Sequence, residues 1–124
     1  MKPIVAVTIG AFMLLLLQGC TVIGNPYKDA GAMRQNLLKL TPIGSTIFDV
    51  EAKLRKKHFD IKLNVNHGFI RRTDRKPIGE MSIEAHLVSY RSGFLSSTTV
   101  TGFWGFDGES RLVDVWVWKD VDSL

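Results

Sequence analysis

The feature that most constrains this chain is an apolar run at its N-terminus. After Lys2, the residues from Ile4 to Leu17 are apolar except for Thr8 and Gly10. About fourteen helical residues at ~1.5 Å each span ~21 Å, whereas the hydrocarbon core of a bilayer is ~30 Å thick. A basic residue followed by a short apolar run is typical of a secretion signal. We therefore predict that residues 1–19 are a removed signal peptide rather than a transmembrane helix.

The run ends in Leu17, Gln18, Gly19 and Cys20, which resemble the bacterial lipobox. In that motif a Leu stands three residues before the cysteine, and small residues precede the cysteine directly. Cys20 is the one cysteine of the chain, so it has no partner for an internal disulfide. The resemblance implies that Cys20 is lipidated and becomes the first mature residue; the alternative is a buried structural thiol.

Lipidation at Cys20 would tether the mature protein to a bilayer without crossing it, because several acyl chains bind far more firmly than one. In Gram-negative lipoproteins, Asp after the lipidated cysteine often marks inner-membrane retention, and here the residue is Thr21. By that resemblance we expect the inner leaflet of the outer membrane, facing the periplasm. Export from the cytoplasm argues against a nucleic-acid partner.

The mature chain of 105 residues is sufficient for one domain, and loss of Lys2 with the signal lowers the formal net charge from +4 to about +3. This modest positive charge suits anionic headgroups or an acidic partner protein. Residues 20–40 show no sustained periodicity until Met33, so we expect a lipidated tether that ends in a short helical turn or irregular segment. The folded domain is expected over residues 41–124.

A helix is predicted from Thr46 to about Lys57, where Ile47, Val50 and Leu54 recur on one face. Thr46 and Asp49 approximate a capping box, and the basic residues fall toward the C-terminal end, as the helix dipole favours. We expect Val50 and Leu54 to be buried against a sheet. The two lysines on the other side of this helix, Lys53 and Lys57, are expected to be exposed.

The pattern then changes to alternation with a period of two, which is typical of half-buried strands. Strands are expected over 61–65, 81–90, 98–106 and 111–119, the last two joined around Asp107-Gly108. Residues 71–76 and 91–97 are expected to be a basic loop and a turn. This order predicts an α+β fold of two layers, with an N-terminal helix packed on a three- to four-stranded antiparallel sheet.

The segment from Gly44 to Leu54 resembles the Gly-x-Thr-x-x-x-Val-x-x-x-Leu helix entry of the BamE (SmpA/OmlA) outer-membrane lipoproteins. The strand Val100 to Phe106, the Asp-Gly turn and the strand Leu112 to Val115 look like the closing hairpin of that family. The resemblance implies a BamE-like fold and an envelope location. It carries over no catalytic or ligand residue, because none of the matched positions has such a role.

Catalytic and metal chemistry find little support in the sequence. His58, His67 and His86 are separated by nine and nineteen positions, unlike zinc ligands. No Gly-x-Ser-x-Gly motif or other nucleophile context surrounds a serine. We therefore predict a protein that is not an enzyme and that has no cofactor and no metal.

A basic cluster is the first candidate for binding. These side chains could contact phospholipid or lipopolysaccharide phosphates from a tethered position, and the alternative is a solvated helix end and loop. The headgroup-binding candidates are Arg55, Lys56, Lys57, Arg71 and Arg72.

The closing hairpin provides the second candidate, because strand alternation sends its residues to two faces. The first face is expected to be core and collects Val100, Gly102, Trp104, Phe106, Val113, Val115 and Val117. The other face collects Thr99, Thr101, Phe103, Leu112, Asp114, Trp116 and Trp118. Among these, Phe103, Trp116 and Trp118 are the partner-binding candidates, since Trp is enriched at interfaces. The alternative is that the tether or residues 33–40 fold over them.

These observations predict an accessory or scaffold protein of the outer-membrane or cell-envelope assembly machinery, tethered by lipid and bound to an envelope protein. The alternative is a periplasmic inhibitor or binding lipoprotein that captures an enzyme or a small ligand.

Overall fold

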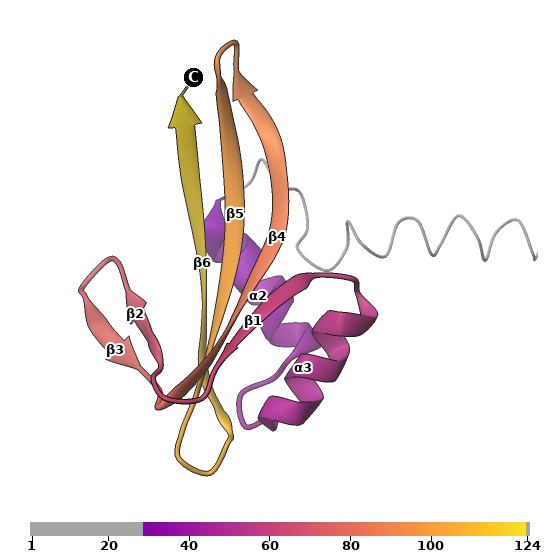
Figure 1. Ribbon diagram of the computed structural model, residues 1–124, viewed down its shortest axis with the longest axis vertical. Helices are drawn as coiled ribbons and strands as arrows, with labels where there is room; N and C mark the ends of the chain where they lie inside the picture. The colour runs from indigo at the N-terminus through magenta and orange to yellow at the C-terminus, as the bar shows by residue number, and fades with distance from the viewer. Residues whose placement is uncertain (1–28, 124) are drawn as a thin grey trace, which may run out of the picture.

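The computed structural model describes residues 29–123 (Figure 1). The predicted signal peptide, the lipobox and Cys20 lie outside these residues. The described elements, in chain order, are α2 (Ala30–Leu40), α3 (Ile47–Lys56), β1 (Asp60–Asn64), β2 (Phe69–Arg71), β3 (Lys76–Ile78), β4 (Met81–Gly93), β5 (Ser96–Phe106) and β6 (Leu112–Ser123).

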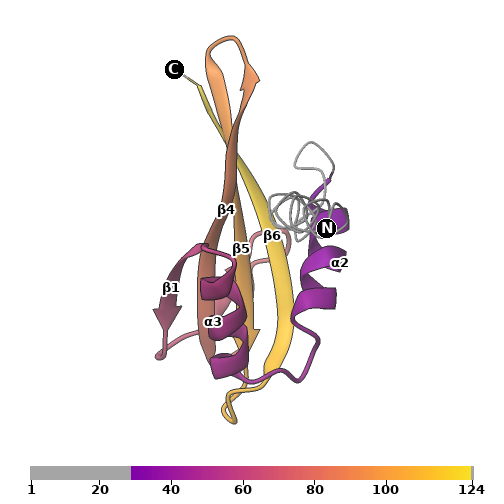
Figure 2. The same cartoon turned by 90° about the vertical axis from the view of Figure 1, so that its right-hand side faces the viewer.

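The strands form two antiparallel sheets. The larger has the order β1-β4-β5-β6, and β2 pairs only with β3. Helices α2 and α3 pack on one face of the larger sheet, and the β2–β3 hairpin lies on the other side (Figures 1 and 2). The predicted α+β fold with a helix packed on an antiparallel sheet is confirmed. None of the helices between residues 29 and 123 is long and apolar enough to cross a membrane.

Helix α3 begins where the sequence predicts. The Thr46 hydroxyl accepts a hydrogen bond from the Asp49 backbone N–H at 3.2 Å, which caps the helix. Val50 and Leu54 are fully buried, as expected. The expected exposure of Lys53 is wrong in part: its side chain is 39% exposed, because Nζ donates to the Leu40 carbonyl at 3.1 Å. Lys57, at the C-cap, is likewise only half-exposed.

Residues 30–40, expected to end a tether, instead form a helix of the domain. Asp29 caps this helix by accepting a hydrogen bond from the Ala32 N–H at 2.8 Å. Met33 and Leu37 lie four residues apart on one face, and both are fully buried in the core. Because this helix has only two buried positions, its hydrophobic periodicity in the sequence is weak. The folded part therefore includes α2, and a boundary at residue 41 is too late.

The core lies between the two helices and the sheet. Its largest side chain is Trp104, whose Nε1 donates to the Thr41 hydroxyl at 3.0 Å, while that hydroxyl donates to the Leu37 carbonyl at 2.8 Å. The indole N–H is thus satisfied inside an apolar environment. The other buried hydrophobic residues of this cluster are Met33, Leu37, Ile47, Val50, Leu54, Ile83, Ala85, Leu87, Val100, Phe106, Leu112, Val115 and Val117.

In the closing hairpin, formed by β5 and β6, the side chains point to the predicted sides of the sheet except near the turn. Pairing is regular from Ser96↔Ser123 to Gly105↔Asp114 and then shifts, so that Phe106 pairs with Leu112. One extra residue moves the following side chains to the opposite face. Leu112 is therefore buried and Val113 is 41% exposed, the reverse of the expectation.

Of the two segments expected to be irregular, one is largely as predicted and the other is not. Residues 72–75 form the turn of the β2–β3 hairpin, and only Arg71 and Lys76 at its ends belong to strands. Residues 91–97 continue β4 and β5, and only Phe94 and Leu95 form the turn between them. In the first predicted strand, pairing ends at Asn64 and leaves Val65 59% exposed.

Candidate functional site

The candidate site is the sheet face opposite the helices, where the β2–β3 hairpin covers part of β5 and β6. Two glycines allow the hairpin to lie this close. Gly79 has a φ of 80°, and a Cβ there would lie 2.7 Å from the Phe106 backbone nitrogen. A Cβ on Gly68 would collide with the carbonyl oxygen of Ile78. The Glu80 N–H also donates to the Phe106 carbonyl at 2.6 Å, which fixes the hairpin base to β5.

The three predicted partner-binding aromatics lie on this face. Phe103 pairs with Trp116, and Thr101 pairs with Trp118, while their chain neighbours point into the helix-side core. All three aromatic side chains are half-buried. Phe69, from β2, packs on Phe103 with ring centroids 5.7 Å apart and an interplanar angle of 34°. The predicted face is confirmed, and the 69–78 hairpin rather than residues 33–40 covers part of it. The tether, which was the other expected cover, lies outside the described residues.

Two of the predicted headgroup-binding residues lie against these tryptophans. The Arg71 guanidinium lies 5.7 Å from the Trp116 ring centroid, and the Arg72 guanidinium lies 4.8 Å from that of Trp118. Both distances are within cation–π range. Arg72 and the Trp118 Nε1 also donate to the same Asp120 oxygen, at 3.1 and 2.8 Å. We call the surface made by Phe69, Phe103, Trp116, Trp118, Arg71 and Arg72 the hairpin face.

Carboxylates hold the arginines in place. Arg71 donates to both oxygens of Asp74, at 3.0 and 2.5 Å. This hydrogen bond lowers the pKa of Asp74 to about 2 and raises the pKa of Arg71. Asp114 lies 3.7 Å from Arg71 and 2.5 Å from Arg34 of α2, so one carboxylate links the hairpin to the helix layer.

One polar atom of the hairpin face has no partner. The Trp116 Nε1 is buried, and it meets no hydrogen-bond acceptor within the part of the chain that the structure describes. Leaving a buried N–H unsatisfied costs about 1–3 kcal/mol. The packing of this face is therefore less complete than that of the core around Trp104.

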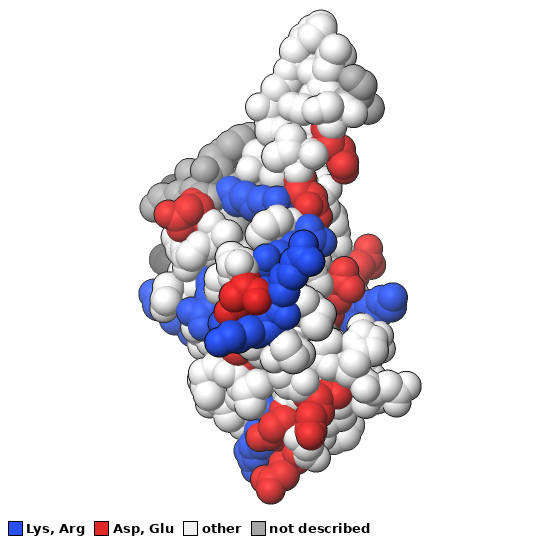
Figure 3. Space-filling view, turned by 90° about the vertical axis from the view of Figure 1, so that its left-hand side faces the viewer, with Lys and Arg blue, Asp and Glu red and all other residues white. Residues whose placement is uncertain are grey.

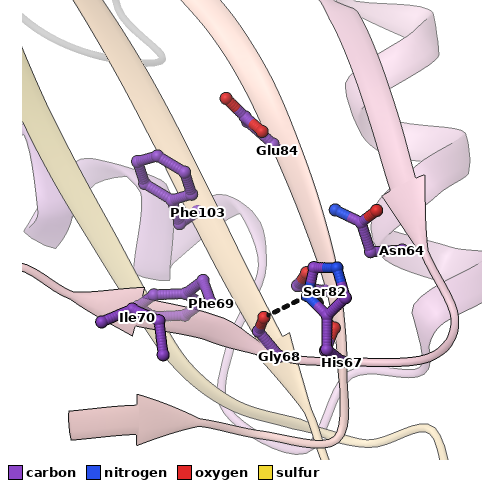
Figure 4. A pocket seen from close by; sticks show the side chains of 8 residues that line it. All are labelled: Asn64, His67, Gly68, Phe69, Ile70, Ser82, Glu84 and Phe103. Atoms are coloured by element: carbon purple, nitrogen blue, oxygen red, sulfur yellow. Dashed lines mark hydrogen bonds between the residues drawn. The ribbon is translucent and has the colours of Figure 1, made fainter. Parts of the chain in front are cut away.

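A shallow hollow of about 170 Å³ borders the hairpin face beside β1 and β4 (Figure 4). Phe69 and Phe103 form one side, and Glu84 and Asn64 lie across from them. Ser82 donates to the His67 carbonyl at 3.1 Å, which holds the loop before β2 at the rim. The hollow also borders Gly68 and Ile70.

The remaining headgroup-binding candidates lie elsewhere. Arg55, Lys56 and Lys57 are at the C-terminal end of α3, on the other side of the sheet from the hairpin (Figure 1). Figure 3 views the hairpin side and shows Lys and Arg gathered across its middle. Arg55 pairs with Glu51 at 3.0 Å. The five candidates therefore form two separate groups, which a single flat membrane surface would not contact together.

Sequence reasoning missed the partners that organise this face, namely Phe69, Asp74, Asp114 and Asp120. The available signal was the apolar pair Phe69-Ile70 followed, after a charged turn, by Pro77-Ile78. Within residues 29–123, no three His, Cys, Asp or Glu side chains are grouped so that they could hold a metal ion. No protein-family model, no curated protein and no solved structure matches the chain.

Proposed function

We propose that this chain is a membrane-tethered bacterial lipoprotein that acts as an accessory or scaffold protein of the cell envelope. The anchor is Cys20, which follows Leu17, Gln18 and Gly19 at the end of the apolar run. Asp29 lies nine positions after Cys20, and extended chain of that length reaches roughly 30 Å. The folded domain would therefore work within a short distance of the outer membrane, facing the periplasm.

The observation that carries the proposed role is the stacking of two arginines on two tryptophans across the hairpin face. Trp and Arg are the residue types most enriched where protein interfaces gain their binding energy. Here the carboxylates of Asp74 and Asp120 hold each guanidinium in one position before a partner arrives. An arginine that is already ordered loses less side-chain entropy on binding.

A protein is a better occupant of this face than a small molecule. Ligand pockets usually enclose about 300–1,000 Å³, and the hollow beside Phe69 and Phe103 is smaller and shallow. It has room for one side chain of a partner. Ile70, 59% exposed at its edge, and Arg72, half-exposed, extend the surface on which that partner would rest.

The alternative function, a periplasmic inhibitor or binding lipoprotein, would use the same face against a soluble target. Affinity capture from solubilised envelope separates the two. The full-length chain, cross-linked in cells, should recover membrane-assembly proteins if it is a scaffold. Recovery of a soluble periplasmic enzyme instead would support the inhibitor.

Matched variants connect the captured protein to the hairpin face. Ile70→Asp and Trp118→Ala should lose the partner, while Phe48→Ala should keep it, because Phe48 is 75% exposed on α3. Retention of the partner by a variant carrying both hairpin-face changes would place the interface elsewhere.

The anchor has its own test. Cys20→Ala should remove the mass of the acyl groups and release the protein from the membrane fraction or leave the precursor unprocessed. An unchanged mass and unchanged fractionation would end the lipoprotein proposal.

A further inference from the structure

The outer end of the sheet projects beyond the helices and the β2–β3 hairpin as an arm of three strands (Figures 1 and 2). The arm consists of the ends of β4, β5 and β6, and its tip is the turn Phe94-Leu95. Phe94 is 88% exposed and Leu95 is 55% exposed. Two large apolar side chains thus occupy the most distant point of the arm.

The turn itself does not require these residues. Two-residue hairpin loops favour Gly, Asn and Asp, whose side chains tolerate a positive φ. Neither Phe94 nor Leu95 has a positive φ, so smaller polar residues could fill both positions. The sequence also has no charged residue from Ser92 to Phe106. On the face seen in Figure 3, the described residues at the corresponding tip of the molecule are uncharged.

The position of α2 relates this tip to the membrane. The Ala30 end of α2 is directed toward the same end of the sheet as the arm, and its Leu40 end leads away toward α3 (Figure 2). With Cys20 only nine residues before Asp29, an anchor there can lie in the plane that the tip reaches. We propose that Phe94 and Leu95 insert into the surface of the bilayer that holds the anchor, as a second contact that orients the domain. This inference rests on the proposed function.

The charges on the arm define the depth of insertion. Arg91 pairs with Ser97, and Ser97 pairs with Asp122, so both charged residues lie level with Ser97, two residues from Leu95. At ~3.3 Å per strand residue this places them about 7 Å below the tip. Interfacial elements bury their apolar side chains ~5–10 Å into the headgroup and acyl boundary. Phe94 and Leu95 would reach that boundary while Arg91 and Asp122 remain among hydrated headgroups.

A spin label tests the placement directly. The lipidated full-length protein carries Leu95→Cys or, as the control, Glu109→Cys, which lies in the turn at the opposite end of the sheet. Because Cys20 is acylated, the new cysteine is the one free thiol. In vesicles of phosphatidylethanolamine and phosphatidylglycerol, the label at 95 should be accessible to oxygen and shielded from a water-soluble nickel chelate. The label at 109 should show the reverse.

A second substitution makes the result specific for the tip. Phe94→Asp, added to the Leu95→Cys chain, should return the label to water and increase its collisions with the nickel chelate to the level of the label at 109, with the thermal unfolding temperature unchanged. If the protein floats with the vesicles while the label at 95 remains accessible to the nickel chelate, insertion of the tip is overturned and the lipid anchor at Cys20 is supported. Shielding that appears only when a partner protein is added also overturns it, in favour of protein docking.

The remaining outcomes concern the anchor. A chain that floats without acyl mass on Cys20 overturns the lipid anchor. Cys20 is then a second free thiol, so the label at 95 is measured in a chain that also carries Cys20→Ala, and its shielding there supports insertion of the tip. A chain that fails to float overturns both.

Discussion

The two faces of the β5–β6 pair differ in how completely their tryptophans are packed. On the helix side, Trp104 is fully buried and its N–H donates to Thr41. On the hairpin side, Trp116 is half-buried and its N–H meets no acceptor among the described residues. The same two strands therefore carry a core in which the buried indole N–H has an acceptor on one face. On the other face they carry a surface in which the buried indole N–H has none among the described residues.

The difference follows from what covers each face. Two helices of ten and eleven residues cover the helix side, whereas strands of three residues cover the other. Apolar burial on the helix side contributes several kcal/mol per large side chain. Exposed cation–π contacts, such as that between Arg72 and Trp118, contribute about 0.5–1 kcal/mol each. Side chains of the hairpin face can thus be substituted at little cost to the free energy of unfolding.

The largest expected effect is that of Trp104→Ala. Removal of the buried indole leaves a cavity and deprives the Thr41 hydroxyl of its donor, so the free energy of unfolding should fall by about 3–5 kcal/mol. Urea unfolding followed by circular dichroism measures this change. A loss below about 1 kcal/mol would show that the helix side is no better packed than the hairpin side.

Leu54→Ala should destabilise the domain by about 2–4 kcal/mol, because Leu54 is fully buried between α3 and the sheet. The matched control is Phe48→Ala on the same helix, where the side chain is 75% exposed and the change should stay within about 0.5 kcal/mol. Equal effects of the two substitutions would mean that α3 packs differently.

Trp118→Ala should cost less than about 2 kcal/mol, because its ring is half-buried and its main contacts are with Arg72 and Asp120. The same urea titration compares it with Trp104→Ala. If the two substitutions prove equally destabilising, the contrast between the faces fails, and the hairpin side must be treated as a second core.

The smallest expected effect is an acid response at Asp74. Folding lowers the pKa of this carboxyl from 3.8 to about 2, so its contribution to stability is complete above pH 4 and is lost as the pH falls toward 2. Asp74→Asn should remove this contribution. The urea midpoints of wild type and variant should differ above pH 4 and converge between pH 4 and 2; parallel curves would mean that Asp74 does not stabilise the hairpin.

The sequence predicts the parts of the fold that strong patterns specify. The Thr46 cap with Val50 and Leu54 defined α3, and alternation placed Trp104 and Trp116 on opposite faces. Two other features have weak local signals. Met33 and Leu37 alone mark α2, and the shift at Gly105 that exchanges Leu112 and Val113 depends on strand pairing.

The sequence identifies most of the residues of the site, but it does not predict how they are arranged relative to one another. Trp116, Trp118, Arg71 and Arg72 were all identified from the sequence, as two unrelated surfaces. Contacts such as that between Arg72 and Asp120 join residues 48 positions apart. Periodicity describes neighbours within one element, so it contains no information on which elements meet.

The position of strand β6 has a mechanical consequence for the anchor that we propose at Cys20. Asp114 of this strand binds Arg34 of α2 on one side and lies beside Arg71 of the hairpin on the other. A pull on the anchored end enters the domain through α2, and β6 is the strand on which α2 packs. With the proposed anchor, load from the membrane would pass into the strand that carries Trp116 and Trp118, and a partner bound there would bear that tension directly.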